Sequence, residues 1–220
     1  GVFYLAVVCD VLEPEERDME RLLGVDFGIV NLAVDSDGTV YSGTDVEHTR
    51  QRFTRRRESL QRHQRRAARR TLRQIAGKQA RFQQYTNHTI AKRLVDTAQR
   101  SAAGIGLEEL TGIRTPVKAR RQQRPRYANW GFAQLRQYVT YKAALAGVPV
   151  ILVDPRHTSQ QCHYCGHIAR ANRPTQERFS CHRCGYQTSA DFNVAQNINY
   201  RAAVKRRMVA QPRQLRLALA

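Results

Sequence analysis

The sequence predicts an α/β fold with a mixed β-sheet, and three observations along the chain lead to this fold class. Three short apolar runs between residues 21 and 43 are separated by Gly and Asp-Gly turn signals, which is the pattern of an antiparallel meander. An apolar strand at 103–110 is followed by a helical segment and a second apolar strand at 148–155, an order typical of α/β proteins. A segment with four cysteines then interrupts the chain. We therefore expect one sheet, flanking helices and a small inserted unit.

The charge balance of the chain is strongly basic. Its 220 residues include 37 Lys and Arg against 18 Asp and Glu, a formal net charge of +19. This balance favours a polyanionic partner, and arginine, which supplies most of the positive charge, suits phosphate groups through its planar fork. No stretch has the roughly 20 apolar residues of a membrane span, and the apolar start lacks the features of a signal peptide. We expect a cytoplasmic protein that binds nucleic acid and no membrane.

An arginine-rich segment follows the meander. From Arg50 to Arg81 the chain has 13 Arg or Lys residues and one acid, with apolar residues seven apart at Phe53, Leu60 and Ala67. This spacing predicts a long helix with a narrow apolar stripe and a cationic face. We expect Gly77 to end it and a second helix, at about 81–100, to pack against it as an antiparallel hairpin. The arginines expected to contact nucleic acid are Arg52, Arg55, Arg56, Arg62, Arg66, Arg69 and Arg73.

The remaining segments predict the rest of the sheet and its helices. Residues 2–11 have the pattern of a strand ahead of the meander, and the basic, proline-containing residues 111–129 have that of a loop. A helix that ends at Gly147 should lie between the two later strands, and a last helix should begin near Ala190.

The four cysteines predict a metal site. Two Cys-x-x-Cys pairs with fifteen residues between them, each followed by glycine, supply Cys162, Cys165, Cys181 and Cys184. Two such knuckles place four thiolates at tetrahedral spacing around Zn(II), and a shell closed by four protein ligands is structural rather than catalytic. Disulfides are the alternative, which an intracellular chain disfavours.

Three carboxylates are the candidate catalytic residues. Asp26 ends an apolar strand, Glu108 ends another, and Asp191 opens the last helix. Buried carboxylates are costly and repel one another, so three that converge at one sheet edge favour a divalent cation among them. Two-metal nucleases use this arrangement, and we expect Mg(II) or Mn(II) at these three acids. Because neighbouring strand residues face opposite sides, only one of Glu108 and Glu109 can face the ions.

Other roles for these acids stay open at this point. Asp26 could cap a turn, Glu108 could be a solvated strand end, and Asp191 could favour the helix N-terminus through its dipole. The Gly-x-Asp-x-Gly pattern around Asp26 also resembles the first hairpin of actin-like and sugar-kinase-like ATPases. The absence of a later glycine-rich phosphate loop in the sequence disfavours that interpretation.

Taken together, the motifs resemble the C-terminal part of the TnpB (OrfB) proteins of insertion sequences, relatives of the type V CRISPR nucleases. The similarity runs through GVDFGIVNLAV, the arginine-rich helix, IGLEELTGIR, the segment from Trp130 to His167, FSCHRCGY and ADFNVAQNI. It implies a RuvC-like, RNase H-like fold with an inserted zinc ribbon, and it implies that Asp26, Glu108 and Asp191 are the catalytic triad. One departure is Val194-Ala195, where the family usually has two alanines.

The resemblance also implies an organisation and a function. Residues 1–20 would end an N-terminal domain, residues 21–159 and 187–208 would form the nuclease domain with a helical insertion at 45–100, residues 160–186 the zinc ribbon, and 209–220 a tail. The implied activity is RNA-guided hydrolysis of DNA phosphodiesters, which leaves a 5′-phosphate and a 3′-hydroxyl. DNA and a guide RNA are the implied partners, with part of guide binding assigned to the family's N-terminal half.

Two other functions fit the same residues. One is a nucleic-acid-binding fragment that does not cut, and the other is a DNA-joining transposase, since RNase H-like transposases use similar acids. The oligomeric state does not follow from the sequence.

Overall fold

The computed structural model describes residues 3, 5, 14–62, 65–109 and 131–218 of the chain. The strand expected at 2–11 and the loop expected at 111–129 lie outside the described residues, as do the side chains beyond Val209. Within the described ranges, no helix combines the length and the apolar character needed to cross a membrane.

A five-stranded mixed sheet forms the centre of the molecule, in the order β3-β2-β1-β4-β5. Strands β1 (Arg21–Asp26), β2 (Asn31–Asp35) and β3 (Val40–Ser42) form the antiparallel meander. β1 also pairs in parallel with β4 (Ala103–Glu108), which pairs in parallel with β5 (Val150–Val153). The predicted mixed sheet is confirmed, with β1 at its centre.

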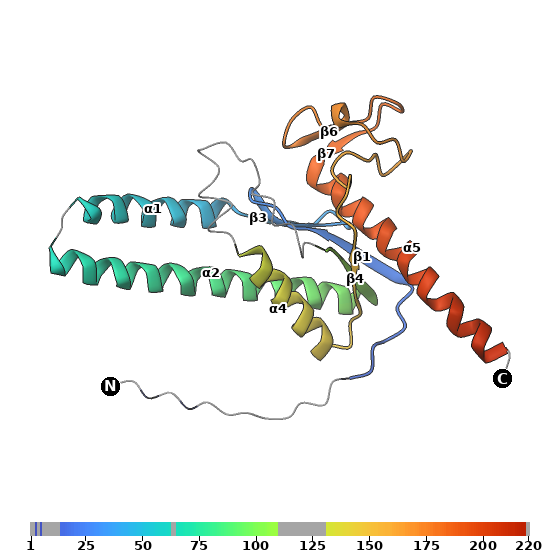
Figure 1. Ribbon diagram of the computed structural model, residues 1–220, viewed down its shortest axis with the longest axis horizontal. Coiled ribbons are helices and arrows are strands. Elements are labelled where there is room, and N and C mark those ends of the chain that lie inside the picture. The colour runs from blue at the N-terminus through green and yellow to red at the C-terminus, as the bar shows by residue number, and fades with distance from the viewer. Residues whose placement is uncertain (1–2, 4, 6–13, 63–64, 110–130, 219–220) are drawn as a thin grey trace.

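Two long helices form the predicted hairpin, but the first of them ends earlier than the sequence predicts. α1 (Thr44–Gln61) and α2 (Arg66–Arg100) run side by side in opposite directions (Figure 1). The expected helix end at Gly77 is wrong, because α2 continues through that residue. One glycine costs a helix only about 1 kcal/mol relative to alanine, which the packing of a 35-residue helix outweighs. α1 ends at Gln61 and α2 begins at Arg66, and the sequence from 61 to 66 has no apolar residue that could continue the helical stripe.

Helices cover both faces of the sheet (Figure 1). α2 and α4 (Phe132–Leu145) pack on the face that carries the buried side chains of Leu23 and Ile105. α5 (Ala190–Ala218) crosses the other face over Leu22 and Val153. Neighbouring residues such as Leu22 and Leu23 are buried on opposite faces because side chains alternate along each strand. α5 begins where the sequence predicts and continues to Ala218, into the segment expected to form a tail.

α5 lies directly against β1 because Gly24 has no side chain. A Cβ atom at Gly24 would lie 2.2 Å from the carbonyl oxygen of Ala195 and 2.4 Å from the backbone nitrogen of Asn199. Asp26 is two residues beyond Gly24, and Asp191 is one helical turn before Ala195. The close packing of helix on strand therefore brings Asp26 and Asp191 to the same end of the sheet.

A small unit is inserted between β5 and α5. Its strands β6 (Arg178–Ser180) and β7 (Gln187–Ser189) pair antiparallel, after the 3-10 turn η1 (Arg170–Asn172). Phe179, Cys162 and Cys181 are buried in a core of its own, separate from the two cores of the sheet. Figure 1 places this unit beside the start of α5.

Candidate active site and metal centre

The three predicted carboxylates line one cavity of about 520 Å³. Asp26 is the last residue of β1 and Glu108 the last of β4, and the parallel register that pairs Val25 with Leu107 places them next to each other. Asp191 reaches the same cavity from the first turn of α5. The structure thus brings together three acids that are separated by more than 80 positions in sequence.

Negative charge is concentrated in this cavity. Burial raises the pKa of Asp26 well above its ordinary value, and the charges of Glu108 and Asp191 raise it further. Burial also raises the pKa of Glu108, against the opposing effects of a hydrogen bond from Thr158 and the charge of Arg201. Both shifts show that ionised carboxylates are costly here without a cation.

Neutral donors orient two of the three carboxylates. The Asn31 side chain donates from Nδ2 to Asp191 Oδ2 at 2.9 Å, and the Thr158 hydroxyl lies 2.6 Å from Glu108 Oε1. These donors hold the carboxylates in place without neutralising them, so their remaining oxygen lone pairs stay available to a ligand.

The carboxylates lie further apart than the cysteine thiols. Among the described residues, one group of three or more Cys, His, Asp or Glu has ligand atoms that all lie within 4.8 Å of one another, and it is the four cysteines. The three acids instead share their cavity at a wider spacing, which leaves space between them.

Glu109, the rival of Glu108, points elsewhere. It pairs with Arg136 on α4 at 3.2 Å and does not line the acid cavity, whereas Glu108 does. Of the two neighbours, Glu108 is therefore the one whose side chain lines this cavity, in line with the alternation of side chains along a strand.

Arg173 also lines the acid cavity, although it is not among the site residues predicted from the sequence. It is the one Lys or Arg among the described residues that line the acid cavity, and its charge lowers the pKa of Asp26. Its Nη2 also donates to the Gln176 carbonyl oxygen at 2.8 Å. No local signal marks it, because it lies in an irregular segment of a chain in which arginine is common.

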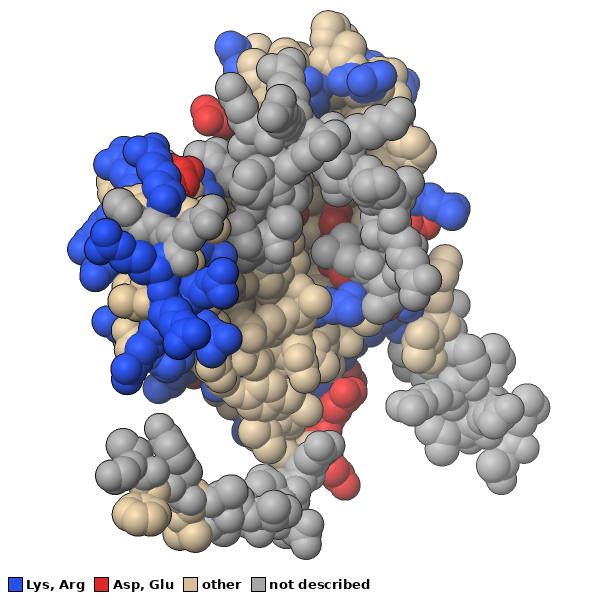
Figure 2. Space-filling view, turned by 60° about the vertical axis from the view of Figure 1, so that its left-hand side comes forward, with Lys and Arg blue, Asp and Glu red and all other residues tan. Residues whose placement is uncertain are grey.

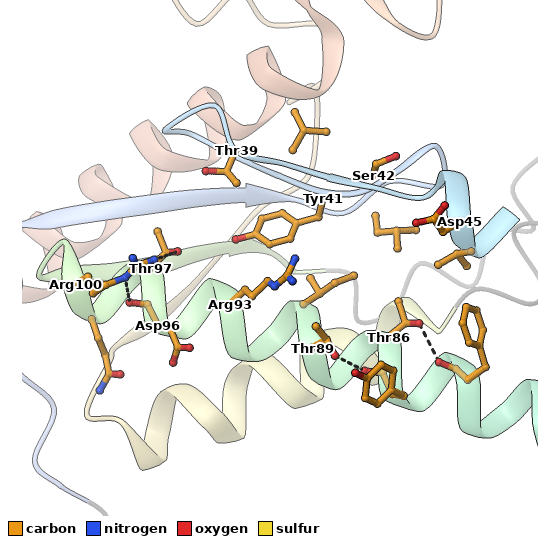
Figure 3. Close-up of a pocket in the computed structure, with 17 residues that line it drawn as sticks. Thr39, Tyr41, Ser42, Asp45, Thr86, Thr89, Arg93, Asp96, Thr97 and Arg100 are labelled. Carbon is orange, nitrogen blue, oxygen red and sulfur yellow. Dashed lines mark hydrogen bonds between the residues drawn. The ribbon is translucent and has the colours of Figure 1, made fainter. Parts of the chain in front are cut away.

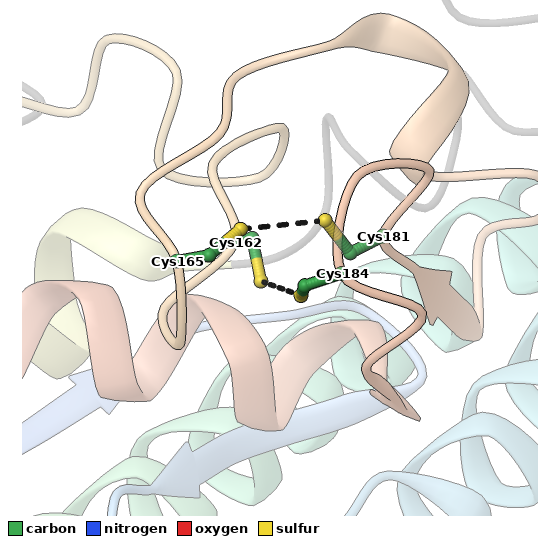
Figure 4. A group of neighbouring side chains, drawn as sticks. All are labelled: Cys162, Cys165, Cys181 and Cys184. Carbon is green, nitrogen blue, oxygen red and sulfur yellow. Dashed lines mark hydrogen bonds between the residues drawn. The ribbon is translucent and has the colours of Figure 1, made fainter.

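The four cysteines converge as predicted (Figure 4). Cys162 Sγ lies 3.8 Å from Cys184 Sγ, and Cys165 Sγ lies 3.6 Å from Cys181 Sγ, so all four are free thiols and the disulfide alternative is wrong. Gly166 and Gly185 adopt φ angles of 74° and 73°, the left-handed conformation that each knuckle requires.

The thiols differ in acidity. Burial raises the pKa of Cys162 to about 12. Burial also acts to raise the pKa of Cys181, but the backbone N–H groups of Cys184 and Arg183 outweigh it and lower the value to about 7. Four converging sulfur ligands of this kind suit a tetrahedral metal ion.

The α1–α2 hairpin presents the predicted cationic surface. The seven predicted arginines are exposed, and six of them lie on the two helices, while Arg62 directly follows the last residue of α1. Figure 2 shows Lys and Arg side chains gathered on the left of the view, the side on which the hairpin projects in Figure 1. The chemistry of this surface suits phosphate groups.

A larger cavity lies between β3 and α2 (Figure 3). Its volume is about 990 Å³, and Arg93 and Arg100 line it together with Asp45, Asp96 and several hydroxyl groups. The two charges of each sign balance, and none of the predicted site residues lines this cavity. The smaller acid cavity differs from it because its acidic side chains outnumber its one arginine.

Two family models match the chain. The model described as a probable transposase matches residues 6–111, and the model described as the Cas12f1-like TNB domain matches residues 132–198. The first contains Asp26 and Glu108, and the second contains Asp191 and the four cysteines.

Named relatives and a solved structure agree with these matches. A CRISPR-associated endodeoxyribonuclease Cas12f1 of Sulfoacidibacillus thermotolerans is 35% identical over 215 residues, which cover 89% of this chain and 49% of that relative. A TnpB-like protein of Methanocaldococcus jannaschii is 25% identical over 194 residues, which cover 83% of this chain and 69% of the relative. The chain spans about half the length of the Cas12f1 relative.

The fold is shared with a solved nuclease complex. A cryo-EM structure of a Cas12f1–sgRNA–target DNA complex matches with a TM-score of 0.68 and 21% identity, over 87% of this chain and 51% of that chain. At this identity the likeness concerns the fold, which is a mixed α/β fold of the Cas12f kind.

Proposed function

We propose that this chain, which belongs to the TnpB (OrfB) family and is also similar to Cas12f proteins, is the nuclease part of a transposon-encoded, RNA-guided DNA endonuclease. The observation that carries the proposal is the meeting of Asp26, Glu108 and Asp191 in one cavity. The sheet order β3-β2-β1-β4-β5, with only the meander antiparallel, supports a RuvC-like, RNase H-like assignment.

The acid cavity fits divalent cations. Its candidate ligands are all carboxylate oxygens, which Mg(II) and Mn(II) prefer, and the raised pKa of Asp26 marks a place where added positive charge is stabilising. Asp26, Glu108 and Asp191 would hold the ions. When bound, the ions would activate a water molecule and stabilise the leaving oxygen of a phosphodiester.

Other residues would position the substrate. The Arg173 guanidinium faces the cavity from the cysteine unit and suits a phosphate oxygen of the scissile group. The cut would leave a 5′-phosphate and a 3′-hydroxyl, by analogy with RNase H-like enzymes. The seven hairpin arginines would follow the backbone of DNA or of a guide RNA, since phosphate contacts of this kind carry no sequence preference.

The four cysteines would hold a structural zinc ion. Four thiolates leave no open position for a substrate, so the zinc would stabilise the inserted unit and would not take part in hydrolysis. Residues 160–186 would then be a zinc ribbon within a nuclease domain that is made of residues 21–159 and 187–208.

Cleavage of single-stranded DNA tests the proposal. The chain should cut in Mg(II), and Asp26→Asn should lower the rate by at least about 100-fold, the usual cost of removing one preorganised electrostatic group. The matched control is Asp37→Asn, an acid in the β2–β3 turn that pairs with Arg21 and lies outside the acid cavity. Equal rates in the wild type and Asp26→Asn would leave a nucleic-acid-binding protein without nuclease activity.

A further inference from the structure

The turn between β5 and the first cysteine knuckle reaches into the acid cavity. Thr158 in this turn is only 3% exposed, and its Oγ1 lies 2.6 Å from Glu108 Oε1 and 2.9 Å from the Pro155 carbonyl oxygen. A threonine hydroxyl has a single proton to donate, and a carboxylate is a stronger acceptor than a carbonyl. Thr158 therefore donates to Glu108 when Glu108 is ionised.

α5 holds this turn from the other side. Asn197 is 2% exposed, and its Nδ2 donates to the carbonyl oxygens of Thr158 and Gln161 at 2.9 and 2.7 Å. Arg201, one turn further along α5, donates to two backbone carbonyl oxygens earlier in the turn, at 2.7 Å each. The backbone of Thr158 is thus fixed by hydrogen bonds from the helix that also carries Asp191.

The same face of α5 holds the first cysteine knuckle. Asn193 is fully buried, donates to the Gln161 carbonyl oxygen at 2.8 Å and accepts from the backbone nitrogen of His163 at 3.1 Å. His163 directly follows Cys162. Hydrogen bonds therefore connect the backbone next to Cys162 with Glu108, through Asn193, Gln161, Asn197 and Thr158 in turn.

The turn also contains a conformation that needs such support. His157, next to Thr158, has a φ angle of 62°. This backbone conformation is unfavourable for a non-glycine residue and persists where its surroundings fix it. The bonds from Asn197 and Arg201 supply that fixation, so the position of the Thr158 hydroxyl depends on the docking of the turn against α5.

We propose that Thr158 is a positioning residue for Glu108, and that the cysteine unit and α5 hold Thr158 in place, which couples order in the cysteine unit to cation binding at the carboxylates. The inference rests on the proposed function, because it takes the acid cavity as a divalent-cation site. A fixed donor selects one arrangement of a flexible glutamate side chain. A cation that needs several carboxylates at once then binds with a smaller loss of conformational freedom.

Manganese binding to the full chain tests the positioning role. Mn(II) serves as the probe, with zinc in the cysteine site, and its affinity is measured by titration followed by electron paramagnetic resonance. Thr158→Val keeps the side-chain shape but removes the donor, and we expect it to weaken binding about 10-fold or more, the usual effect of losing a partner that orients a ligand. Thr158→Ser keeps the hydroxyl and should bind Mn(II) as the wild type does.

The matched control is Thr140→Val. Thr140 is exposed on α4, and its hydroxyl donates to the Arg136 carbonyl oxygen of the same helix at 3.0 Å. This variant makes the same chemical change at a residue that does not line the acid cavity, and it should leave the Mn(II) affinity unchanged. Equal affinities in Thr158→Val and Thr140→Val would overturn the positioning role.

A double substitution tests the coupling. Cys181→Ser should weaken Mn(II) binding when Thr158 is present. In the Thr158→Val background it should weaken binding little further, because the hydrogen bond from residue 158 to Glu108 is already lost there. Additive effects of the two substitutions would overturn the coupling. If Asp26→Asn binds Mn(II) as tightly as the wild type does, the proposed function is overturned as well. If Asp26→Asn weakens Mn(II) binding but Thr158→Val does not, this inference alone is overturned.

Discussion

Asn31 and Asp191 are 160 positions apart in sequence, yet Asn31 Nδ2 donates to Asp191 Oδ2 at 2.9 Å. The bond joins the first residue of β2 to the first turn of α5. It fixes the one predicted ligand that lies on a helix relative to the two that lie on strands. Asn31 thus donates a hydrogen bond to the carboxylate of Asp191, as Thr158 does to that of Glu108.

Asn31→Ala should weaken Mn(II) binding at the acid cavity. The expected loss is about 10-fold, since the carboxylate of Asp191 keeps its charge but loses the donor that orients it. Titration with Mn(II) measures the effect, with Gln74→Ala, which shortens an exposed amide side chain on α2, as the control. An unchanged affinity would mean that α5 alone positions Asp191.

Asp26→Asn should stabilise the protein at neutral pH when no magnesium is added. Burial and the neighbouring acids raise the pKa of Asp26 in the folded state. The stability linked to this group is fully present below the unfolded pKa of about 3.9 and is lost as the pH rises through the folded pKa. The variant should therefore melt at a higher temperature than the wild type at pH 7, and the difference should shrink toward pH 4.

Thermal unfolding across this pH range, with and without Mg(II), measures that effect. Saturating Mg(II) should raise the melting temperature of the wild type and leave Asp26→Asn unchanged. A variant that melts below the wild type at pH 7 without added Mg(II) would contradict the prediction.

Cys181→Ser should prevent the inserted unit from holding the proposed zinc ion. A structural zinc contributes its binding free energy to folding, so a three-thiolate site should lose zinc and the unit should become sensitive to proteases. Zinc content per chain and limited proteolysis of residues 160–186 measure this. Cys9→Ser, which changes the one cysteine outside the four-cysteine motif, should keep its zinc. Full zinc content in Cys181→Ser would contradict the four-cysteine site.

Neutral substitutions on the hairpin should lower the salt dependence of nucleic-acid binding. Changing Arg55, Arg56, Arg62 and Arg66 to Gln keeps good helix formers. It should reduce the slope of log affinity against log salt by about 0.9 for each phosphate of duplex DNA that these arginines neutralise. Binding titrations at several salt concentrations measure the slope, with Arg21→Gln, whose side chain pairs with Asp37, as the control. An unchanged slope would place the phosphate-binding residues elsewhere.

Two glycine substitutions should change stability in opposite directions. Gly24→Ala forces a Cβ to within 2.2 Å of the Ala195 carbonyl oxygen, and such overpacking costs about 1–3 kcal/mol or more. Gly77→Ala meets only the flexible end of Arg81 at 3.4 Å and should stabilise α2 by about 0.5–1 kcal/mol. Thermal unfolding measures both, at about 2–4 °C per kcal/mol. A stable Gly24→Ala would mean that α5 can shift away from β1.

Local sequence patterns were sufficient to predict those features of the structure that depend on residues close together in the chain. The meander, the end of α4 just before Gly147, whose φ is 65°, the start of α5 and the cysteine knuckles all agree with expectation. The hairpin turn was misplaced because the small local penalty of Gly77 was weighed without the packing of α2, which no local pattern contains.

The sequence by itself determined the class of fold, the basic surface, the four-cysteine site and the identity of three candidate acids, because each is written in residue type and short-range spacing. Only the tertiary structure decided that those acids share a cavity, that Asn31 and Thr158 orient two of them, and that Arg173 faces them. The physical reason is that these contacts join segments far apart in the chain. Their geometry comes from sheet register and from the close approach of α5 to Gly24, neither of which has a short-range signature.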